Sequence, residues 1–299
     1  MQSEPRTLHR LEKIVVLFAL AAALALTIGF AQAAGGKRSK AHHPDEDGDP
    51  LALRSSVALV QDANSGEIVF QKGIGAVLPI ASITKLMTAL VMVEAKLDLS
   101  QRVALSSDDQ DLLKGTRSRL KPGTVLTRDE LLLLALMASE NRAAAALART
   151  YPGGTEAFVK AMNAKAAVLG MYDTRFTDAT GLSPANVSSA RDLARLVQAA
   201  HQHPLIAQYS TRESATITAL GRQVAYRNTN GLVRSNTWEI GLSKTGFISE
   251  AGRCLVMRVR LASRDLVVVL LDSWGRYSRI GDANRIRKWL ETSVAAPRS

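Results

Sequence analysis

The stretch Pro79-Ile80-Ala81-Ser82-Ile83-Thr84-Lys85-Leu86-Met87-Thr88 is the most informative part of this chain. Pro79 precedes a predicted helix over residues 82–95, whose apolar side chains cover nearly its whole circumference, so we expect it to be buried. Ser82 and Lys85 are three positions apart and therefore share one helix face. Burial or a nearby cation lowers the pKa of a lysine and makes it a base. The stretch therefore predicts a serine nucleophile with a lysine base.

Ser139-Glu140-Asn141 falls between two predicted helices, Leu131–Met137 and Arg142–Thr150. A loop at this place can project a hydroxyl and an amide toward Ser82. We expect the Ser139 hydroxyl to pass a proton between Lys85 and the leaving group. The Asn141 amide is expected to orient the substrate backbone or to hold Lys85.

Lys244-Thr245-Gly246 ends a predicted strand. A lysine charge beside a threonine hydroxyl suits a substrate carboxylate. Gly246 has no side chain, so a peptide can lie along the strand edge and pair with it. The backbone N–H of Phe247 is then placed to complete an oxyanion hole with the start of the first helix. Each segment alone is common by chance, whereas the three in this order indicate one catalytic set.

Strand patterns occur at both ends of the chain and helical patterns between them. The predicted strands are Val57–Gln61, Glu67–Gln71, Val224–Arg227, Ile240–Gly246, Cys254–Leu261 and Leu266–Leu271. A last helix is predicted from about Ser278 to Ser293. This order predicts an α+β fold in which one antiparallel sheet is built from both chain ends and a helical lobe is inserted.

The first 33 residues are predicted to be a signal peptide. A basic start is followed by the uncharged run Ile14–Phe30 and by Ala31-Gln32-Ala33, which fits a small-x-small cleavage site. The run is close to the lower limit of about 18 residues for a membrane span, so an uncleaved anchor is the alternative. Residues 34–54, rich in Gly, Lys, His, Asp and Pro, are predicted to be a disordered linker. Either way the remaining chain is expected to be exported, to the periplasm.

The remaining residues, 55–299, are long enough for one large domain. We expect its sheet part at about 55–95 and 205–299 and an all-α lobe at about 96–204. The whole chain carries a net charge of +11, of which residues 1–33 supply +1. A basic exported protein favours anionic wall polymer, or a membrane surface in peripheral association, over nucleic acid. The single cysteine, Cys254, lies in an apolar run and is expected to be a core thiol, and no metal site is predicted.

These residues resemble the low-molecular-mass penicillin-binding proteins of the serine D-Ala-D-Ala peptidase family. The resemblance covers about residues 56–292 and is closest to the endopeptidase subgroup. Besides the three segments above, it rests on Ala179-Thr180-Gly181-Leu182-Ser183, Tyr151-Pro152-Gly153-Gly154, Asn228-Thr229-Asn230 and Ala251-Gly252-Arg253-Cys254-Leu255-Val256-Met257.

The resemblance implies the serine β-lactamase/DD-peptidase-like fold, with a five-stranded antiparallel sheet. It implies that an acyl-enzyme forms on peptidoglycan stem peptides of the cell wall, that β-lactam antibiotics are covalent inhibitors and that no cofactor is needed. The roles implied are Ser82 as nucleophile, Lys85 as base, Ser139 as proton shuttle, Asn141 as orienting amide and Lys244 as carboxylate anchor. The reaction expected is hydrolysis of D-alanyl crosslinks, which helps to set cell shape.

Several alternatives remain. The first is a D-Ala-D-Ala carboxypeptidase, which trims terminal D-Ala instead of crosslinks. A β-lactamase of class A needs a glutamate to activate its deacylating water, and no convincing candidate lies between Ser139 and Lys244. A non-catalytic penicillin or peptidoglycan-binding module is expected to have lost a catalytic residue. A Ser-His-Asp triad is disfavoured because there is no G-x-S-x-G turn, and because His201 and His203 adjoin a predicted helix end.

Overall fold

A five-stranded antiparallel sheet is the centre of the fold in this computed structural model, which describes residues 49–295. Its strand order is β2-β1-β11-β10-β9. The strands are β1 (Ser55–Asp62), β2 (Ile68–Lys72), β9 (Glu239–Ile248), β10 (Gly252–Leu261) and β11 (Arg264–Ser273). The pairing of β1 with β11, with Val57 opposite Leu271, joins the two ends of the sequence. The predicted α+β sheet is thereby confirmed, and β9 is one of its edge strands.

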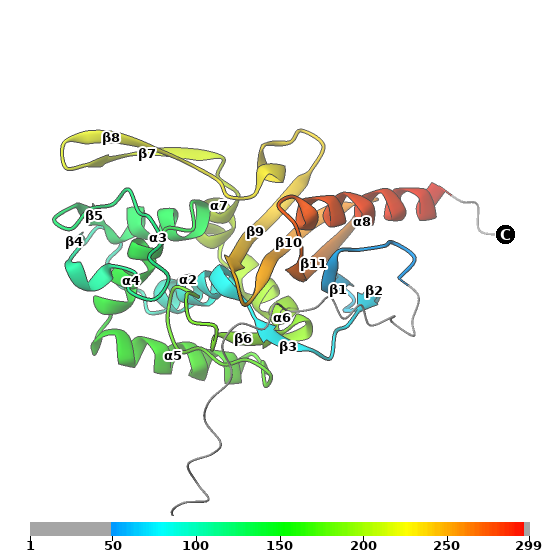
Figure 1. Ribbon diagram of the computed structural model, residues 1–299, viewed down its shortest axis with the longest axis horizontal. Coiled ribbons are helices and arrows are strands. Elements are labelled where there is room, and N and C mark those ends of the chain that lie inside the picture. The colour runs from blue at the N-terminus through cyan, green and yellow to red at the C-terminus, as the bar shows by residue number, and fades with distance from the viewer. Residues whose placement is uncertain (1–48, 296–299) are drawn as a thin grey trace, which may run out of the picture. The chain divides into compact units, whose positions relative to one another are not determined.

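Each face of the sheet packs against its own set of helices (Figure 1). Successive residues of a strand point to opposite faces, so Val57 and Leu59 join one core and Ala58 and Val60 the other. The first core includes side chains of α2 (Thr84–Glu94) and α6 (Ala190–His201), and the second those of α8 (Ser278–Ala295). Both faces are therefore buried, as the long apolar runs of β10 and β11 require.

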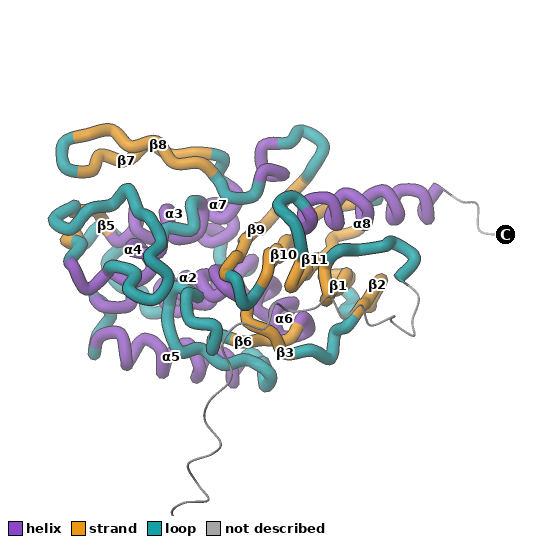
Figure 2. The backbone as a smooth tube through the Cα atoms, in the orientation of Figure 1, coloured by secondary structure: helices purple, strands orange, loops and turns teal. Residues whose placement is uncertain are grey.

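The helical lobe follows α2 in the chain and lies beyond the β9 edge of the sheet (Figure 2). Its helices are α3 (Arg128–Met137), α4 (Asn141–Arg149) and α5 (Gly154–Val168). Two short antiparallel pairs accompany them: β4 (Arg102–Ala104) with β5 (Val125–Thr127), and β3 (Val77–Pro79) with β6 (Val187–Ser189). Two single-turn 3₁₀ helices also lie outside the sheet, η2 (Ser107–Asp109) and η3 (Gly231–Arg234). Thr127 caps α3, and its side chain accepts a hydrogen bond from the backbone N–H of Glu130.

The structure corrects the predicted boundaries of the lobe, which is not all-α. The predicted lobe included α6, but α6 contacts β1, β10 and β11 of the main sheet. The next helix, α7 (Pro204–Thr211), was assigned to the sheet part and contacts both α3 and β9. An amphipathic pattern states that a helix has an apolar face but not which surface that face covers.

A second correction concerns the strand predicted at Val224–Arg227. It belongs to β8 (Arg222–Arg227), which pairs with β7 (Ser214–Ala219) in a separate two-stranded hairpin outside the main sheet. Figure 1 shows this hairpin extending over α3. Residues of β7 alternate between exposed and buried, the pattern of a strand with one covered face.

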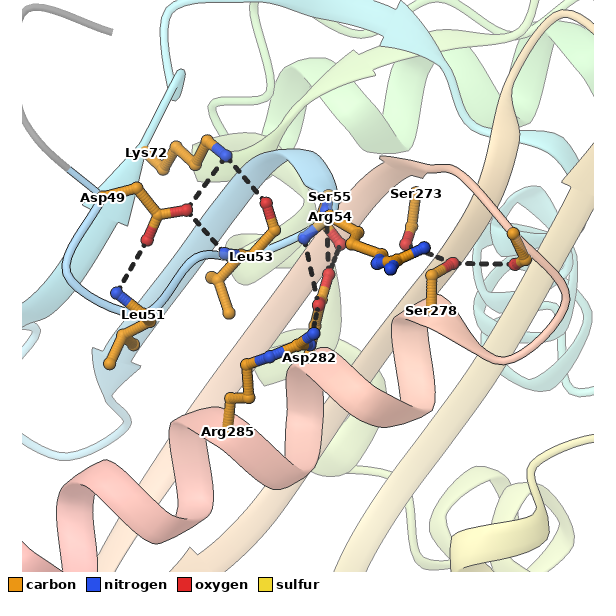
Figure 3. A network of polar contacts seen from close by, with 11 residues as sticks. Asp49, Leu51, Leu53, Arg54, Ser55, Lys72, Ser273, Ser278, Asp282 and Arg285 are labelled. Carbon is orange, nitrogen blue, oxygen red and sulfur yellow. Dashed lines mark hydrogen bonds and ion pairs between the residues drawn. The ribbon is translucent and has the colours of Figure 1, made fainter. Parts of the chain in front are cut away.

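The end of the predicted linker is ordered, which corrects the boundary at residue 54. Asp49 forms an ion pair with Lys72 at 3.1 Å and accepts hydrogen bonds from the backbone N–H groups of Leu51 and Leu53 (Figure 3). The Leu53 side chain is buried. The chain therefore joins the fold at Asp49, whereas the predicted signal peptide and the earlier part of the linker lie outside the described residues.

A buried carboxylate on α8 holds the start of β1 (Figure 3). Asp282 accepts from the backbone N–H groups of Arg54 and Ser55 at 3.1 and 2.8 Å, and from the Ser55 hydroxyl at 2.6 Å. Arg285, one turn further along α8, donates to the same carboxylate. The carboxylate satisfies backbone groups at the end of the strand and fixes the helix on the sheet. Within residues 49–295, no helix combines the length and apolarity that a bilayer crossing requires.

Candidate active site

Ser82 lies where the chain turns into the helix that the sequence predicted. It occupies a single 3₁₀ turn, η1 (Ala81–Ile83), directly before α2. Ala81 has a φ of 48°, a strained conformation for a residue with a side chain. Gly181 packs against this turn so closely that a Cβ there would lie 1.9 Å from the Ala81 carbonyl oxygen. The loop around Gly181 thus braces the strained turn that presents Ser82.

Lys85 is fully buried, and its ammonium group lies at the centre of a polar cluster. Its Nζ donates to Ser82 Oγ at 2.9 Å, to Asn141 Oδ1 at 2.8 Å and to the Thr180 carbonyl at 2.6 Å. Burial lowers the pKa of Lys85 to about 7, although the carboxylates of Asp178, Glu140 and Asp111 act in the opposite direction. A substantial fraction of Lys85 is therefore neutral near neutral pH, as a base requires.

Ser139 and Asn141 occupy the short connection between α3 and α4. Ser139, like Ala81, has a backbone φ in the left-handed region, at 58°. Its hydroxyl accepts a hydrogen bond from Lys244 Nζ at 2.9 Å, while Asn141 accepts from Lys85. The sequence predicted that both residues act with Lys85, whereas in the structure Ser139 contacts Lys244 and Asn141 contacts Lys85.

Lys244, Thr245 and Gly246 lie on β9, the edge strand that faces η1. A Cβ on Gly246 would lie 2.8 Å from the Ile80 carbonyl oxygen and 3.2 Å from the Ser82 nitrogen. Only glycine allows β9 to approach the nucleophile this closely. The Thr245 hydroxyl donates to the Thr229 hydroxyl at 2.7 Å. The structure therefore brings all three predicted segments together around Ser82.

Lys244 is buried as completely as Lys85. Burial, reinforced by the charges of Lys85 and Arg279, lowers the pKa of Lys244 well below its ordinary value. We expected a charged Lys244, and these surroundings oppose that charge in the absence of substrate. A carboxylate bound beside Lys244 acts in the opposite direction and favours the protonated form.

Asp111 and Thr116 extend the polar cluster, and sequence reasoning missed both. Asn141 Nδ2 donates to Thr116 Oγ1 at 2.9 Å, and Thr116 Oγ1 donates to Asp111 Oδ2 at 2.6 Å. A continuous series of hydrogen bonds therefore runs from Asp111 through Asn141 and Lys85 to Ser82. It fixes the Asn141 amide with its oxygen toward Lys85. Both new residues lie in a loop without periodicity, so no sequence pattern marks them.

Two further contacts hold the loops around Ser82. Asp178 accepts from the backbone N–H groups of Thr180, Gly181 and Ser183, and so shapes the loop whose carbonyl receives Lys85. Lys114, in the loop of Thr116, forms an ion pair with Glu250 in the turn after β9. This hydrogen bond lowers the pKa of Glu250 to about 2. The lobe and the sheet are thereby joined beside the site.

Within residues 49–295, neither a cluster of metal ligands nor an exposed thiol is present. No group of three or more His, Cys, Asp and Glu side chains lies close enough there to hold a metal ion. Cys254 is buried, and burial raises the pKa of its thiol to about 11. Cys254 is therefore a core residue, as the sequence predicted.

Solved structures that share this fold include a DD-transpeptidase and a D-alanyl-D-alanine carboxypeptidase. A mutant of Streptomyces K15 DD-transpeptidase is 25% identical with a TM-score of 0.73, over 80% of this chain and 98% of that one. The crystal structure of D-alanyl-D-alanine carboxypeptidase from Mycobacterium tuberculosis H37Rv is 27% identical with a TM-score of 0.71, over 80% and 91%. The five-stranded sheet with its adjoining lobe is therefore the penicillin-binding DD-peptidase fold.

Sequence comparison identifies the family. Residues 40–274 match the Peptidase S11 family, described as D-alanyl-D-alanine carboxypeptidase. A Pseudomonas aeruginosa D-alanyl-D-alanine endopeptidase is 46% identical over 95% of this chain and 89% of its own length. An Escherichia coli K12 protein of the same name is 44% identical over 95% and 90%. The chain belongs to the Peptidase S11 family and is a serine D-Ala-D-Ala peptidase.

Proposed function

We propose that this protein hydrolyses D-alanyl crosslinks of peptidoglycan through an acyl-enzyme on Ser82. Ser82 Oγ attacks the D-Ala carbonyl while Lys85 accepts its proton. The N–H groups of Ser82 and Phe247 stabilise the oxyanion. The C–N bond then breaks, and the proton that Lys85 accepted passes through Ser139 to the leaving amine. Water attacks the resulting ester and releases Ser82.

The observation that carries this mechanism is the hydrogen bond between Lys85 and Ser82, made by a lysine whose pKa is near neutrality. In this arrangement the proton acceptor touches the nucleophile before substrate arrives. Lys244 and Thr245 are proposed to hold the carboxylate of the leaving residue, and Asn141 to orient Lys85 and the substrate backbone. Ser139, bonded to Lys244, is placed to return a proton on the leaving-group side.

Acylation by a fluorescent penicillin tests the assignment of the nucleophile. We expect a covalent adduct on the wild-type protein and none on Ser82→Ala. A matched control is Ser107→Ala, which removes an exposed hydroxyl from η2 and leaves Ser82 intact. An adduct that persists in Ser82→Ala would refute the assignment.

Cleavage of crosslinks, in preference to removal of terminal D-Ala, is supported by the two endopeptidase relatives. A crosslinked dimer and a monomeric pentapeptide at equal concentration separate the two reactions. We expect a higher kcat/KM for the dimer. Faster release of D-Ala from the pentapeptide would indicate a carboxypeptidase, the activity in the family's description.

A β-lactamase remains the less favoured enzyme. Glu156, a glutamate between Ser139 and Lys244, is exposed and pairs with Lys160 on the surface of α5. A stable penicillin adduct therefore agrees with the proposal, and rapid turnover of penicillin contradicts it.

We also propose that the protein is exported to the periplasm and attaches to anionic surfaces only peripherally. The uncharged run near the start and the net charge of +11 motivate this proposal. Salt is expected to release the protein from membranes, because exposed charges are screened at high ionic strength. A requirement for detergent would instead support an uncleaved N-terminal anchor.

A further inference from the structure

A cavity of about 320 Å³ lies directly beyond the glycine that contacts the nucleophile. Its lining begins with Phe247, the residue after Gly246, and continues from the turn after β9 to the loop after β11. The remaining lining residues are Ser249, Gly252, Arg253, Ser273, Trp274, Gly275 and Arg276. Because a strand advances about 3.3 Å per residue, Phe247 and Ser249 lie roughly one and three residues past the reacting centre.

The direction of the substrate on β9 follows from the proposed function. Lys244 and Thr245 precede Gly246 and would hold the leaving residue's carboxylate. The reacting carbonyl would lie between the N–H groups of Ser82 and Phe247. The residues that precede the scissile D-Ala then extend past Phe247 toward Ser249, antiparallel to β9. The cavity therefore faces the residues that precede the scissile bond, which we call the acyl side of the substrate. It does not face the leaving group.

Exposed aromatic rings and two arginines gather at this cavity. Phe247, Trp274 and Tyr277 are 55%, 57% and 70% exposed, which is unusual for rings of their size. The Arg253 guanidinium lies 4.6 Å from the centre of the Phe247 ring, and that of Arg276 lies 5.4 Å from the Tyr277 ring. The rings support the flat faces of the guanidinium groups and leave their N–H donors available.

Neither guanidinium is neutralised within residues 49–295. Arg253 and Arg276 form no ion pair and no side-chain hydrogen bond there. Of the two nearby carboxylates, Glu250 pairs with Lys114, whereas Asp272 accepts a hydrogen bond from the neutral Ser56 hydroxyl and keeps its charge. Two unpaired cations with planar donor edges suit a carboxylate.

We propose that this cavity binds a free carboxylate on the acyl side of the stem peptide, through Arg253 and Arg276. The residues that precede D-Ala in a stem peptide carry such carboxylates, whereas the compact acyl group of benzylpenicillin carries none in that position. Phe247 and Trp274 cover the adjoining peptide. The subsite rests on the proposed function, and it serves crosslink cleavage and D-Ala trimming alike because both reactions share the acyl side.

The test compares stem-peptide substrates with free and with amidated acyl-side carboxylates. For Arg253→Gln we expect kcat/KM on the free carboxylate to fall about tenfold, the scale of one charge-assisted hydrogen bond. Arg276→Gln is expected to act in the same direction. The amidated substrate should be nearly insensitive to both changes, as should acylation by benzylpenicillin, and Arg253→Lys should recover part of the loss.

Arg260→Gln is the matched control, because Arg260 is an exposed arginine at the opposite end of the same strand. It should leave the ratio between free and amidated substrates unchanged. Equal losses on the two substrates, or the same loss in Arg260→Gln, would overturn the subsite. Absence of penicillin acylation or of all peptide cleavage in the wild type would instead refute the proposed function. If only the pentapeptide is cleaved, the same comparison is made with pentapeptides.

Discussion

The two buried lysines both have a lowered pKa, for partly different reasons. Lys85 touches Ser82, and its pKa of about 7 follows mainly from burial. Lys244 touches Ser139, and its pKa is lowered by burial and also by the charges of Lys85 and Arg279. The two lysines repel each other when both are charged, so an anionic substrate beside Lys244 also changes the balance at Lys85.

Acylation by penicillin should accelerate as the pH rises through about 7. Below that value Lys85 is protonated and cannot accept the Ser82 proton, whereas above it the lone pair is free. Stopped-flow measurement of the acylation rate from pH 5 to 9 tests this. Lys85→Arg should be slower by at least about 10²-fold at every pH, since arginine does not deprotonate. A flat profile in the wild type would contradict the assigned base.

Lys244→Arg should retain measurable acylation because it preserves the cation that would hold a carboxylate. The expected change is a higher KM with a smaller loss in kcat, since arginine is longer and its donors have another geometry. Steady-state kinetics on a stem peptide measure both. Complete loss equal to that of Lys85→Arg would argue against separate roles for the lysines.

The Asp111 carboxylate should influence the pKa of Lys85 without touching it. Its charge raises the pKa of Lys85, so Asp111→Asn should lower that pKa and move the acid limb of the acylation profile to lower pH. Thr116→Val keeps the charge but breaks the bond to Asn141, and should slow acylation about tenfold without moving the limb. Thr116→Ser should restore the rate. Identical effects of Asp111→Asn and Thr116→Val would indicate loop disruption alone.

Among the elements, α8 and β1 are joined more tightly than their sequences suggest. The buried Asp282 carboxylate accepts three hydrogen bonds from Arg54 and Ser55, residues that precede or begin the first strand (Figure 3). A further hydrogen bond, from Ser273 Oγ to Ser278 Oγ at 2.7 Å, ties the start of the helix to the end of β11. Asp282 is therefore the polar link between α8 and the start of β1, in addition to the apolar core that the helix shares with the sheet.

Asp282→Ala should destabilise the fold by about 3 kcal/mol, because it leaves buried N–H and O–H groups without an acceptor. Chemical denaturation of the protein measures the change in the free energy of unfolding. Glu291→Ala removes an exposed partner of Arg287 on the same helix and should cost less than about 1 kcal/mol. Comparable losses of unfolding free energy in both variants would show that the hydrogen bonds of Asp282 do not stabilise the fold more than an exposed ion pair does.

The elements also show which structural features can be predicted from the sequence. The proximity of Ser82, Lys85, Ser139, Asn141 and Lys244 could be predicted because these residues stand in three short segments with fixed spacing. The strands β1, β10 and β11 could be predicted because burial on both faces requires apolar runs. These signals are local, and each needs only a few neighbouring residues.

Other features depend on partners that are distant in sequence. Asp111 was missed because its role arises through Thr116 and Asn141. The assignment of α6 to the lobe was wrong because its apolar face fits either a helix or a sheet. The disordered linker was extended too far because the polar composition around Asp49 resembles a linker, and its partner Lys72 lies 23 residues away.

At the scale of the whole molecule, the sheet is assembled from both ends of the described chain, and this arrangement governs when the protein can fold. β1 ends at Asp62, and its partner β11 begins at Arg264, about 200 residues later. The central strands cannot pair while the ribosome has yet to make β11. Non-local pairing of this kind folds slowly and keeps the nascent chain open during synthesis. A chain that ends at Leu261 should therefore be digested completely by protease and should not yield a stable lobe. In the full chain, residues 49–295 should resist limited proteolysis.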